Sequence, residues 1–304
     1  MRVLVTGASG FLGVPVIQRL VEAGEDILAL SRNVPVEITP GSIRWVRADL
    51  SEPSTYRQAV EEFAPEVLVH LAWQDIPDFS FEKSRQNLEQ SLDLLTVVLG
   101  TGSCRKMLVA GSCLEVNRTK GECFESDVGS AKDGFTWAKH TIRSWLEVRC
   151  AEHGISLGWL RIFYVYGPRQ RPQALVPIIL SHLREGALPP LRTPANCNDF
   201  VYIGDLAEAF LAFVRHEFSA GVFNVSSGLS TSVLDVCRHA EQIVCGSDSL
   251  SRQLADSVHG SSADVDFWGN TCRIESEVGW SPAIPMADGI LQTWQYLEAS
   301  LTVE

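Results

Sequence analysis

The chain has 304 residues, of which 45% are hydrophobic and 20% are charged, and its formal net charge at pH 7 is −12. This length allows one large α/β domain with a smaller appendage, or two modest domains. The negative charge argues against nucleic acid or an anionic membrane as the main partner, so a phosphate-bearing ligand must be held by a local site. No stretch reaches the roughly 20 apolar residues that span a bilayer.

The N-terminus leads directly into a strand, without the basic and apolar regions of a signal peptide. The eight cysteines are scattered, with no CxxC spacing and no Cys/His cluster. We therefore expect reduced thiols, no metal site and a cytoplasmic location.

Strand and helix patterns alternate along the first half of the chain. Apolar runs predict strands at residues 2–6, 25–31, 43–46, 66–71, 106–110 and 156–163. Helical patterns begin at Gly10 and cover about 81–100 and 134–153. These repeated strand–helix–strand units predict an α/β fold with a Rossmann-type, doubly wound parallel sheet.

The regular alternation ends at Tyr166-Gly167-Pro168, and prolines are frequent in the segment that follows. Residues 199–214 are expected to form a short strand and a helix that return to the main sheet. Residues 247–262, rich in serine and other polar residues, are expected to be lobe and surface loop. We predict a dinucleotide-binding Rossmann domain formed by residues 1–165 and about 198–225. A smaller C-terminal substrate-binding lobe would comprise 166–197 and 226–304.

The first strand runs into the turn Gly-Ala-Ser-Gly-Phe-Leu-Gly at residues 7–13. The first glycine permits a tight turn, the second lets the backbone approach a pyrophosphate, and the third lets helix and strand pack closely. The helix N-terminus then offers unsatisfied N–H groups and a favourable dipole to the phosphates. We expect a dinucleotide to be bound by Gly7, Ser9, Gly10, Phe11, Leu12 and Gly13.

The end of the second strand bears on the choice of dinucleotide. NAD enzymes usually place Asp or Glu there to bind the ribose hydroxyls, whereas this chain has Leu30-Ser31-Arg32-Asn33. A hydroxyl and a guanidinium pair well with a 2′-phosphate, which favours NADP(H). NAD(H) stays open, because Ser31 and Arg32 also suit the start of a solvated loop. Asp49 and Leu50 follow the third strand and are placed to meet the adenine.

Read in order, these residues resemble the extended short-chain dehydrogenase/reductase family, especially its nucleotide-sugar epimerases, dehydratases and reductases. The resemblance covers nearly the whole chain, through TGxxGxxG at 6–13, Asp-Leu at 49–50, His-Leu-Ala at 70–72, VYGP at 165–168, NDFVYIGD at 198–205 and GWSP at 279–282. It implies a small-molecule substrate such as a nucleotide sugar, and a homodimer formed through the helices at 81–100 and 134–153. It also implies cofactor contacts from Leu71, Ala72, Trp73, Lys139 and Phe163.

The chemistry of that family requires a Tyr hydroxyl, a Lys four residues later, and a Ser or Thr from the end of the fifth strand. The resemblance places Lys139 at the lysine position and Ser112 or Cys113 at the Ser/Thr position, but Phe135 occupies the tyrosine position. A phenyl ring has no proton to transfer, and a lost acid/base typically costs about 10²–10⁴-fold in rate. Asn198, where the family usually has arginine, departs as well, which favours a naturally divergent chain over an engineered change at Phe135.

Several other groups are candidates to replace the phenol. Cys113 is a weak hydrogen-bonding substitute, a reactive thiolate or a small buried apolar residue. Glu115 stands where the family's dehydratases have an acidic catalytic residue. Further candidates are Tyr164, Tyr166, Tyr202 and His140. Arg169 and Arg171, together with Tyr166, are the expected contacts of a substrate diphosphate or carboxylate.

Three functions remain open on this reading. We favour an NADP(H)-dependent oxidoreductase, epimerase or dehydratase with a Tyr-less active site. The first alternative is a catalytically weak or inactive NADPH-binding sensor or scaffold protein. The second is a non-redox enzyme on the same fold.

Overall fold

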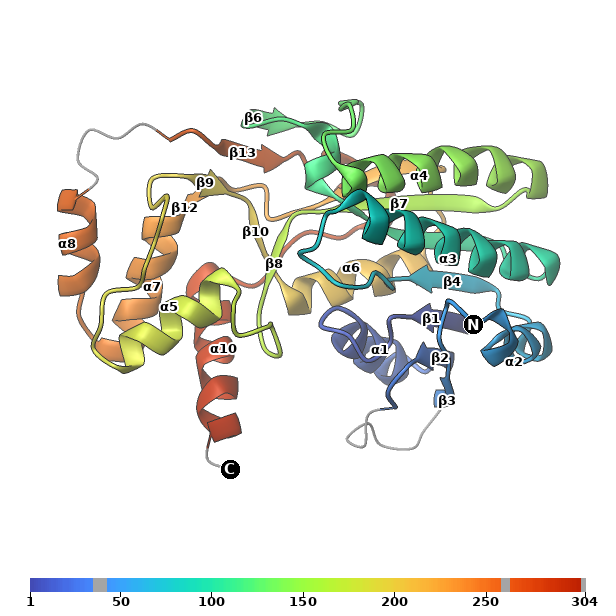
Figure 1. The fold of residues 1–304 in the computed structure, drawn as a ribbon, viewed down its shortest axis with the longest axis horizontal. Coiled ribbons are helices and arrows are strands. Elements are labelled where there is room, and N and C mark those ends of the chain that lie inside the picture. Colours follow the sequence, from blue (N-terminus) through green and yellow to red (C-terminus); the bar gives the residue numbers. More distant parts are fainter. Residues whose placement is uncertain (35–42, 258–262, 302–304) are drawn as a thin grey trace.

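The computed structural model describes residues 1–34, 43–257 and 263–301. Its largest part is a seven-stranded parallel sheet in the order β11-β7-β5-β4-β1-β2-β3 (Figure 1). Successive strands are added outward from β1 to one edge, and the chain then crosses to add the remaining strands at the other edge, which is the doubly wound arrangement. The strands are β1 (Arg2–Thr6), β2 (Asp26–Ser31), β3 (Ile43–Arg47), β4 (Val67–His70), β5 (Lys106–Ser112), β7 (Ser156–Ile162) and β11 (Gly221–Val225).

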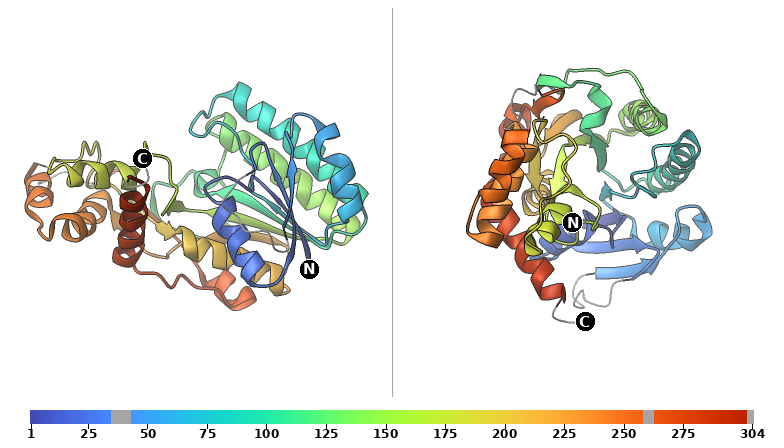
Figure 2. Two further views of the ribbon diagram at one scale, coloured as in Figure 1. Left: turned by 90° about the horizontal axis from the view of Figure 1, so that it is seen from below. Right: turned by 60° about the vertical axis from the view of Figure 1, so that its left-hand side comes forward.

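Helices cover both faces of this sheet (Figure 2). On one face α1 (Gly13–Glu22) packs against α6 (Ile203–Arg215), and on the other face lie α2 (Arg57–Phe63), α3 (Phe81–Gly100) and α4 (Gly134–His153). Successive strand residues point to opposite faces, so Val3 and Val5 join the core beneath α1 and α6, whereas Leu4 joins the core beneath α3 and α4. Burial on both faces explains why these strands are apolar throughout.

A smaller lobe extends from the carboxyl-end side of the sheet, on the left of Figure 1. It contains α5 (Leu175–Arg184), α7 (Val233–Cys245), α8 (Ser249–Ser257) and α10 (Met286–Leu301). Two small sheets join it to the main body: β8 (Tyr164–Tyr166) pairs with β10 (Phe200–Tyr202), and β12 (Thr231–Ser232), β9 (Cys197–Asn198), β13 (Asp266–Gly269) and β6 (Lys120–Cys123) form the other. The remaining elements are the short helices η1 (Pro53–Thr55), η2 (Cys113–Val116) and α9 (Cys272–Val278).

The α/β class, the parallel sheet and both long helices are confirmed, and the strand ends lie within two residues of the predicted ones. One expectation was wrong: β10 does not return to the main sheet, because β11 occupies the position beside β7 and β10 pairs with β8 instead. Only α6 returns to the main body. The regular part of the first helix begins at Gly13 rather than at Gly10, since residues 8–12 form turns.

The serine-rich segment was predicted as loop, but residues 249–257 form helix α8; residues 258–262 lie outside the described part. Glu241, on α7, accepts hydrogen bonds from the backbone N–H groups of Leu250 and Ser251 and thereby holds the first turn of α8. The domain boundaries stay a prediction, and α9, which falls within the predicted lobe, packs against β11.

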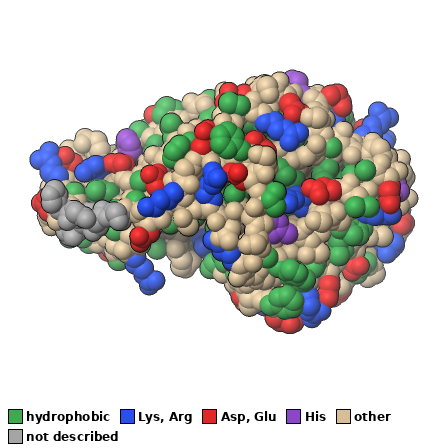
Figure 3. Space-filling view, turned by 90° about the horizontal axis from the view of Figure 1, so that it is seen from above, with side chains coloured by type: hydrophobic (Ala, Val, Ile, Leu, Met, Phe, Trp, Pro, Cys, Tyr) green, Lys and Arg blue, Asp and Glu red, His purple; other side chains and the backbone are tan. Residues whose placement is uncertain are grey.

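All eight cysteines are free thiols. Among the described residues, no cluster of His, Cys, Asp or Glu could hold a metal ion. The same residues form no helix with the length and apolar character needed to cross a membrane. On the face shown in Figure 3, positively and negatively charged side chains are interspersed rather than segregated.

Candidate active site

A cavity of about 580 Å³ opens at the carboxyl ends of the strands, where the sheet order reverses between β1 and β4. This reversal point is where open α/β sheets bind their ligands. The cavity is lined by most of the predicted cofactor contacts: Gly7, Ser9, Gly10, Phe11, Leu12, Gly13, Ser31, Arg32, Leu50, Leu71, Ala72, Trp73, Lys139 and Phe163. Of the predicted catalytic and substrate residues, it is lined by Ser112, Cys113, Phe135 and Arg171.

The glycine turn requires glycine for steric reasons. Gly7 has φ +66°, and a Cβ there would lie 2.8 Å from the backbone nitrogen of Ala72. A Cβ on Gly13 would collide with the carbonyl oxygen of Gly7 and lie 2.7 Å from that of Ala8. Helix α1 has no side-chain N-cap, which leaves its N-terminus open to an anionic ligand, although Val14 already donates to the carbonyl oxygen of Gly10 (3.2 Å) and Pro15 has no N–H group.

The turn rests on a buried polar chain that joins β1, β4 and α3. Thr6 Oγ1 accepts from the backbone N–H of Ala72 (3.3 Å) and lies 2.7 Å from His70 Nδ1, whereas His70 Nε2 lies 3.1 Å from Ser91 Oγ. Burial, and then the charge of Lys139, lower the pKa of His70 to about 3. The imidazole is therefore neutral at physiological pH and acts as a spacer between these elements.

The predicted 2′-phosphate contacts lie together at one end of the cavity. Ser9 Oγ and Ser31 Oγ are 2.5 Å apart, and Ser31 Oγ also donates to the carbonyl oxygen of Asn33 (2.7 Å). Asp49 was expected beside the adenine but does not line the cavity. Its Oδ1 accepts hydrogen bonds from the backbone and side chain of Ser51 (2.9 and 2.7 Å), and these bonds lower its pKa.

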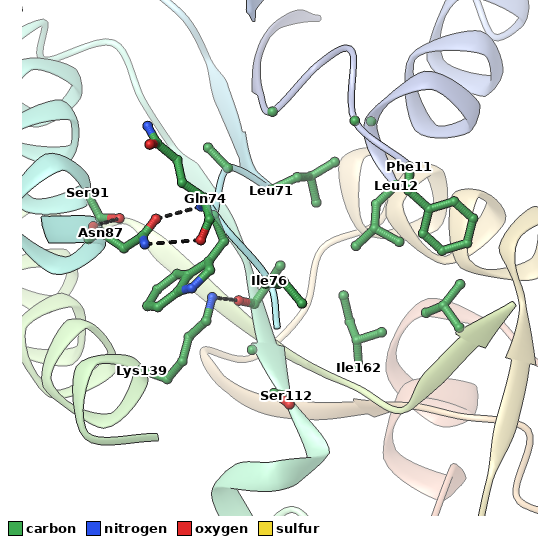
Figure 4. Close-up of a pocket in the computed structure, with 18 of the residues that line it drawn as sticks. Phe11, Leu12, Leu71, Gln74, Ile76, Asn87, Ser91, Ser112, Lys139 and Ile162 are labelled. Atoms are coloured by element: carbon green, nitrogen blue, oxygen red, sulfur yellow. Dashed lines mark hydrogen bonds between the residues drawn. The ribbon is translucent and has the colours of Figure 1, made fainter. Parts of the chain in front are cut away.

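Lys139 lies at the opposite end, on α4, where it is only 6% exposed. Its Nζ donates to the carbonyl oxygen of Ala110 (2.7 Å) and lies 4.1 Å from the ring centroid of Trp73. Figure 4 shows the side chain entering the cavity from α4. Burial lowers the pKa of Lys139 to about 8, and the negative charge of Glu115 opposes this effect.

Phe135 lies one helical turn before Lys139, and its ring centroid is 5.7 Å from Lys139 Nζ. The ring is 5% exposed, because Trp73 packs against it edge-on at 5.1 Å and Phe79 covers it at 4.8 Å. Position 135 is therefore part of an aromatic cluster of Trp73, Phe79 and Phe135, and the side chain there provides no proton.

The other catalytic candidates lie at the end of β5 and just after it, and they differ in whether they line the cavity. Ser112 lines the cavity, and its Oγ accepts from the backbone N–H of Leu114 (3.2 Å). Glu115 does not line the cavity. It is fully buried, and its two oxygens accept from the backbone N–H of Ser112 (2.6 Å) and from Trp159 Nε1 (2.9 Å). This placement gives Glu115 a structural role and does not support the expected proton transfer.

Cys113 lines the cavity but is 4% exposed. Burial, followed by the charge of Asp199, raises the pKa of the Cys113 thiol far above its ordinary value. Of the three roles considered for Cys113, this environment favours the small buried apolar residue, since an ionised sulfur would be poorly solvated here. The geometry gives no support to a catalytic thiolate at Cys113.

The predicted substrate contacts are dispersed. Arg171 lines the cavity and donates from Nη1 to the carbonyl oxygen of Ile76 (3.0 Å), whereas Arg169 lines a second hollow beside α1 and α6. Tyr166 is buried outside the cavity, and its hydroxyl donates to the carbonyl oxygen of Met286 (3.4 Å). The predicted substrate role of Tyr166 thus has no support in the geometry. Among the other candidates, Tyr164 lines the cavity and His140 and Tyr202 do not.

Two elements supply lining residues that were not among the predicted site residues: the segment after β4 contributes Gln74, Ile76 and Phe79, and helix α3 contributes Asn87, Gln90 and Ser91. Asn87 holds this segment in place, because its Oδ1 accepts from the backbone N–H of Gln74 (2.7 Å) and its Nδ2 donates to the carbonyl oxygen of the same residue (3.3 Å; Figure 4). One signal in the sequence could have identified Asn87, because it stands where the short-chain dehydrogenase/reductase family has an asparagine in the helix after the fourth strand.

A family model described as the NAD dependent epimerase/dehydratase family matches residues 3–226. Among curated relatives, UDP-glucose 4-epimerase of Azospirillum brasilense is 25% identical over 99% of this chain and 92% of its own length. The mouse dTDP-D-glucose 4,6-dehydratase is 21% identical over 97% of this chain and 88% of its own length.

Solved structures of the same kind share the fold. A UDP-glucose 4-epimerase from Thermotoga maritima, solved with UDP-glucose, has a TM-score of 0.84 at 21% identity and covers 99% of this chain and 100% of its own. A UDP-glucose 4-epimerase from Thermus thermophilus, solved with NAD, has a TM-score of 0.76 at 23% identity over 99% and 100% of the two chains.

Proposed function

Because this chain belongs to the NAD-dependent epimerase/dehydratase family, within the extended short-chain dehydrogenases/reductases, we propose that it is an NADP(H)-dependent oxidoreductase, epimerase or dehydratase with a Tyr-less site. Its substrate would be a nucleotide-linked sugar or a similar keto or hydroxy compound. The observation that carries this proposal is that one cavity joins the glycine turn, the Ser31–Arg32 pair, Ser112 and Lys139.

The residues present fit a phosphorylated dinucleotide. Among the described lining residues, Arg32, Lys139 and Arg171 are cationic and none is Asp or Glu, in a chain of net charge −12. Two buried polar atoms of the lining, Trp73 Nε1 and Gln170 Oε1, have no hydrogen-bond partner in the protein. Buried polar groups are normally paired, so these atoms support the presence of a ligand.

The dinucleotide would supply hydride transfer when bound. In this proposal the backbone of the glycine turn holds the pyrophosphate, and Ser31 and Arg32 hold the 2′-phosphate. Lys139 binds at the nicotinamide end, and Ser112 hydrogen-bonds the substrate oxygen. The apolar rings of Trp73 and Phe79 exclude water from the reacting atoms.

Titration of NADPH and NADH into the purified protein tests the cofactor assignment. Charge-assisted hydrogen bonds to a phosphate are worth about 1.5–3 kcal/mol, so Arg32→Ala should weaken NADPH binding by roughly 10- to 100-fold and leave NADH binding almost unchanged. Arg47→Ala is the matched control, because Arg47 is exposed at the end of β3 and does not line the cavity. Tighter binding of NADH would refute the NADP(H) assignment, and binding of neither would refute the proposal as a whole.

A second candidate function is a cofactor-binding protein without turnover. The specific observation in its favour is that Phe135 offers no proton and is covered by Trp73 and Phe79. This function predicts NADPH binding without hydride transfer to any nucleotide-sugar ketone, in the wild type and in Phe135→Tyr alike.

We also propose a homodimer formed through α3 and α4. These helices pack side by side and carry the exposed apolar residues Phe81 (58%) and Val148 (59%). Light scattering after size-exclusion chromatography should give twice the 33.5 kDa chain mass, and Val148→Glu should shift the equilibrium towards monomer. A monomeric wild type would refute this arrangement.

A further inference from the structure

Lys139 lines the cavity with an ammonium whose hydrogen-bonding capacity is only partly used by the described part of the protein. An ammonium has three donors. One bonds to the carbonyl oxygen of Ala110 at 2.7 Å, and the Trp73 ring face lies 4.1 Å from Nζ. No further hydrogen-bond acceptor contacts this nitrogen among residues 1–34, 43–257 and 263–301, and the side chain lines the cavity.

The other ionisable groups near this end of the cavity are poorly placed to give a proton. Glu115 is fully buried behind the wall with both oxygens accepting hydrogen bonds, and burial raises the pKa of the Cys113 thiol so far that it holds its proton tightly. Arg171 does not lose its proton in proteins. Tyr164 also lines the cavity, but burial raises the pKa of its phenol well above the ordinary value, which makes it a weak acid.

We propose that Lys139 is itself the proton donor to the substrate oxygen in the reductive direction, the part that a tyrosine at position 135 would take. This inference rests on the proposed function, because it requires a reduced nicotinamide cofactor. The carbonyl carbon of the substrate receives the hydride, and its oxygen takes the proton from Nζ. The alcohol, the oxidised cofactor and a neutral amine result, and the amine regains its proton from water.

The electrostatic surroundings suit this role. Burial lowers the pKa of Lys139 to about 8, so at neutral pH the side chain is protonated yet gives up its proton at little cost. From η2 the buried Glu115 raises the pKa, and from β4 His70 adds no charge, because its own pKa is about 3. Cys113, from the segment after β5, is neutral as well.

A purely structural or ribose-binding lysine would behave differently. Its removal would weaken cofactor binding or stability, but the rate of proton transfer would not follow its ionisation. If instead Lys139 is the acid, reductive kcat falls about tenfold per pH unit above pH 8, because only the ammonium form is active. The pKa of Lys139 measured directly and the pKa seen in the pH dependence of kcat should therefore agree, although they come from two separate measurements.

The experiment combines an NMR titration of ¹³Cε-labelled lysine with kinetics on 4-keto nucleotide sugars. We expect a lysine signal that titrates near pH 8 and is absent from Lys139→Arg. Lys139→Met and Lys139→Arg should lose about 10²–10⁴-fold in kcat while NADPH affinity changes by less than about tenfold. Lys132→Met is the control, because Lys132 is exposed just before α4 and does not line the cavity.

Several other outcomes would each refute proton donation by Lys139 for a different reason. Titration of Lys139 above pH 10, or wild-type turnover in Lys139→Met, would overturn it, and loss of turnover in Tyr164→Phe alone would transfer the role to that phenol. If the wild type binds NADPH but only Phe135→Tyr turns over, the family function stands and donation by Lys139 is refuted. If neither the wild type nor Phe135→Tyr turns over, both the proposed enzymatic function and proton donation by Lys139 are refuted. If NADPH does not bind at all, the proposed function is refuted whatever the role of Lys139.

Discussion

Asp199 joins three segments of the chain through one buried carboxylate, and its replacement by asparagine is a strict test of how the lobe is held to the main body. The residue is fully buried. Its Oδ1 accepts from the backbone N–H (2.6 Å) and the hydroxyl (2.7 Å) of Ser227, and its Oδ2 accepts from the backbone N–H groups of Gly228 (3.0 Å) and Gly269 (3.1 Å).

The expected loss for Asp199→Asn follows from these four bonds. Asparagine keeps one acceptor oxygen and presents an amide NH₂ to the other pair of donors, so at least one pair loses its acceptor in either orientation. An unsatisfied buried donor costs about 1–3 kcal/mol, which gives about 2–6 kcal/mol for two. Burial raises the pKa of Asp199, so the neutral amide recovers part of the desolvation cost. We therefore expect a net destabilisation of roughly 2–4 kcal/mol.

Urea unfolding measures this loss as a shift of the midpoint at unchanged slope. Asp264→Asn is the matched control, because Asp264 is exposed in the segment before β13 and should stay within about 0.5 kcal/mol of the wild type. A shift below 0.5 kcal/mol for Asp199→Asn itself would refute the claim that its four bonds hold the lobe in place.

Three further predictions follow from other positions. Because the unfolded chain protonates the His70 ring below pH 6.5 and the folded chain resists this until about pH 3, unfolding free energy should fall by roughly 3 kcal/mol from pH 7 to pH 4 through this group. His70→Asn should show a correspondingly shallower pH slope, and an identical slope would contradict the assignment. Gly7→Ala should weaken NADPH binding at least about tenfold in a fluorescence titration, because the added Cβ meets the Ala72 nitrogen at 2.8 Å; unchanged affinity would count against the glycine cradle. Glu115→Gln should lower unfolding free energy by about 1–3 kcal/mol, since the single amide oxygen can accept from only one of the two buried donors, the Ser112 N–H and Trp159 Nε1. Its kcat should stay within about threefold of the wild type, and loss of kcat at normal stability would restore Glu115 as an acid.

Elements whose ends are determined by neighbouring residues could be predicted from the sequence. Helix α4 begins at the capping residue Asp133, whose side chain accepts from the N–H of Thr136, and ends at Gly154 in the left-handed conformation. Both signals lie within the local pattern. The first turn of α8 depends instead on Glu241 from another helix, and β10 depends on whether β11 takes the sheet edge. Those are long-range facts that periodicity does not contain.

The same distinction divides the site. The glycine turn and the Ser31–Arg32 pair are each a short local motif at the end of a strand, so the sequence alone predicted that both line the cavity. Glu115 looked equally functional, because spacing shows which residues follow β5 but not which way each side chain turns. Its burial against Trp159 is decided by the packing of β7 on β5.

Trp73 contacts the two residues that matter most for proton transfer, Phe135 and Lys139. The centroid of its ring lies 5.1 Å from that of Phe135 and 4.1 Å from Lys139 Nζ. The residue that packs against position 135, where the family has its tyrosine, therefore also contacts the ammonium. A hydroxyl at position 135 would have to share this closely packed space with both groups. The aromatic cluster therefore favours a phenylalanine at this position, and Lys139, which lies beside the cluster, keeps its ammonium at the cavity wall.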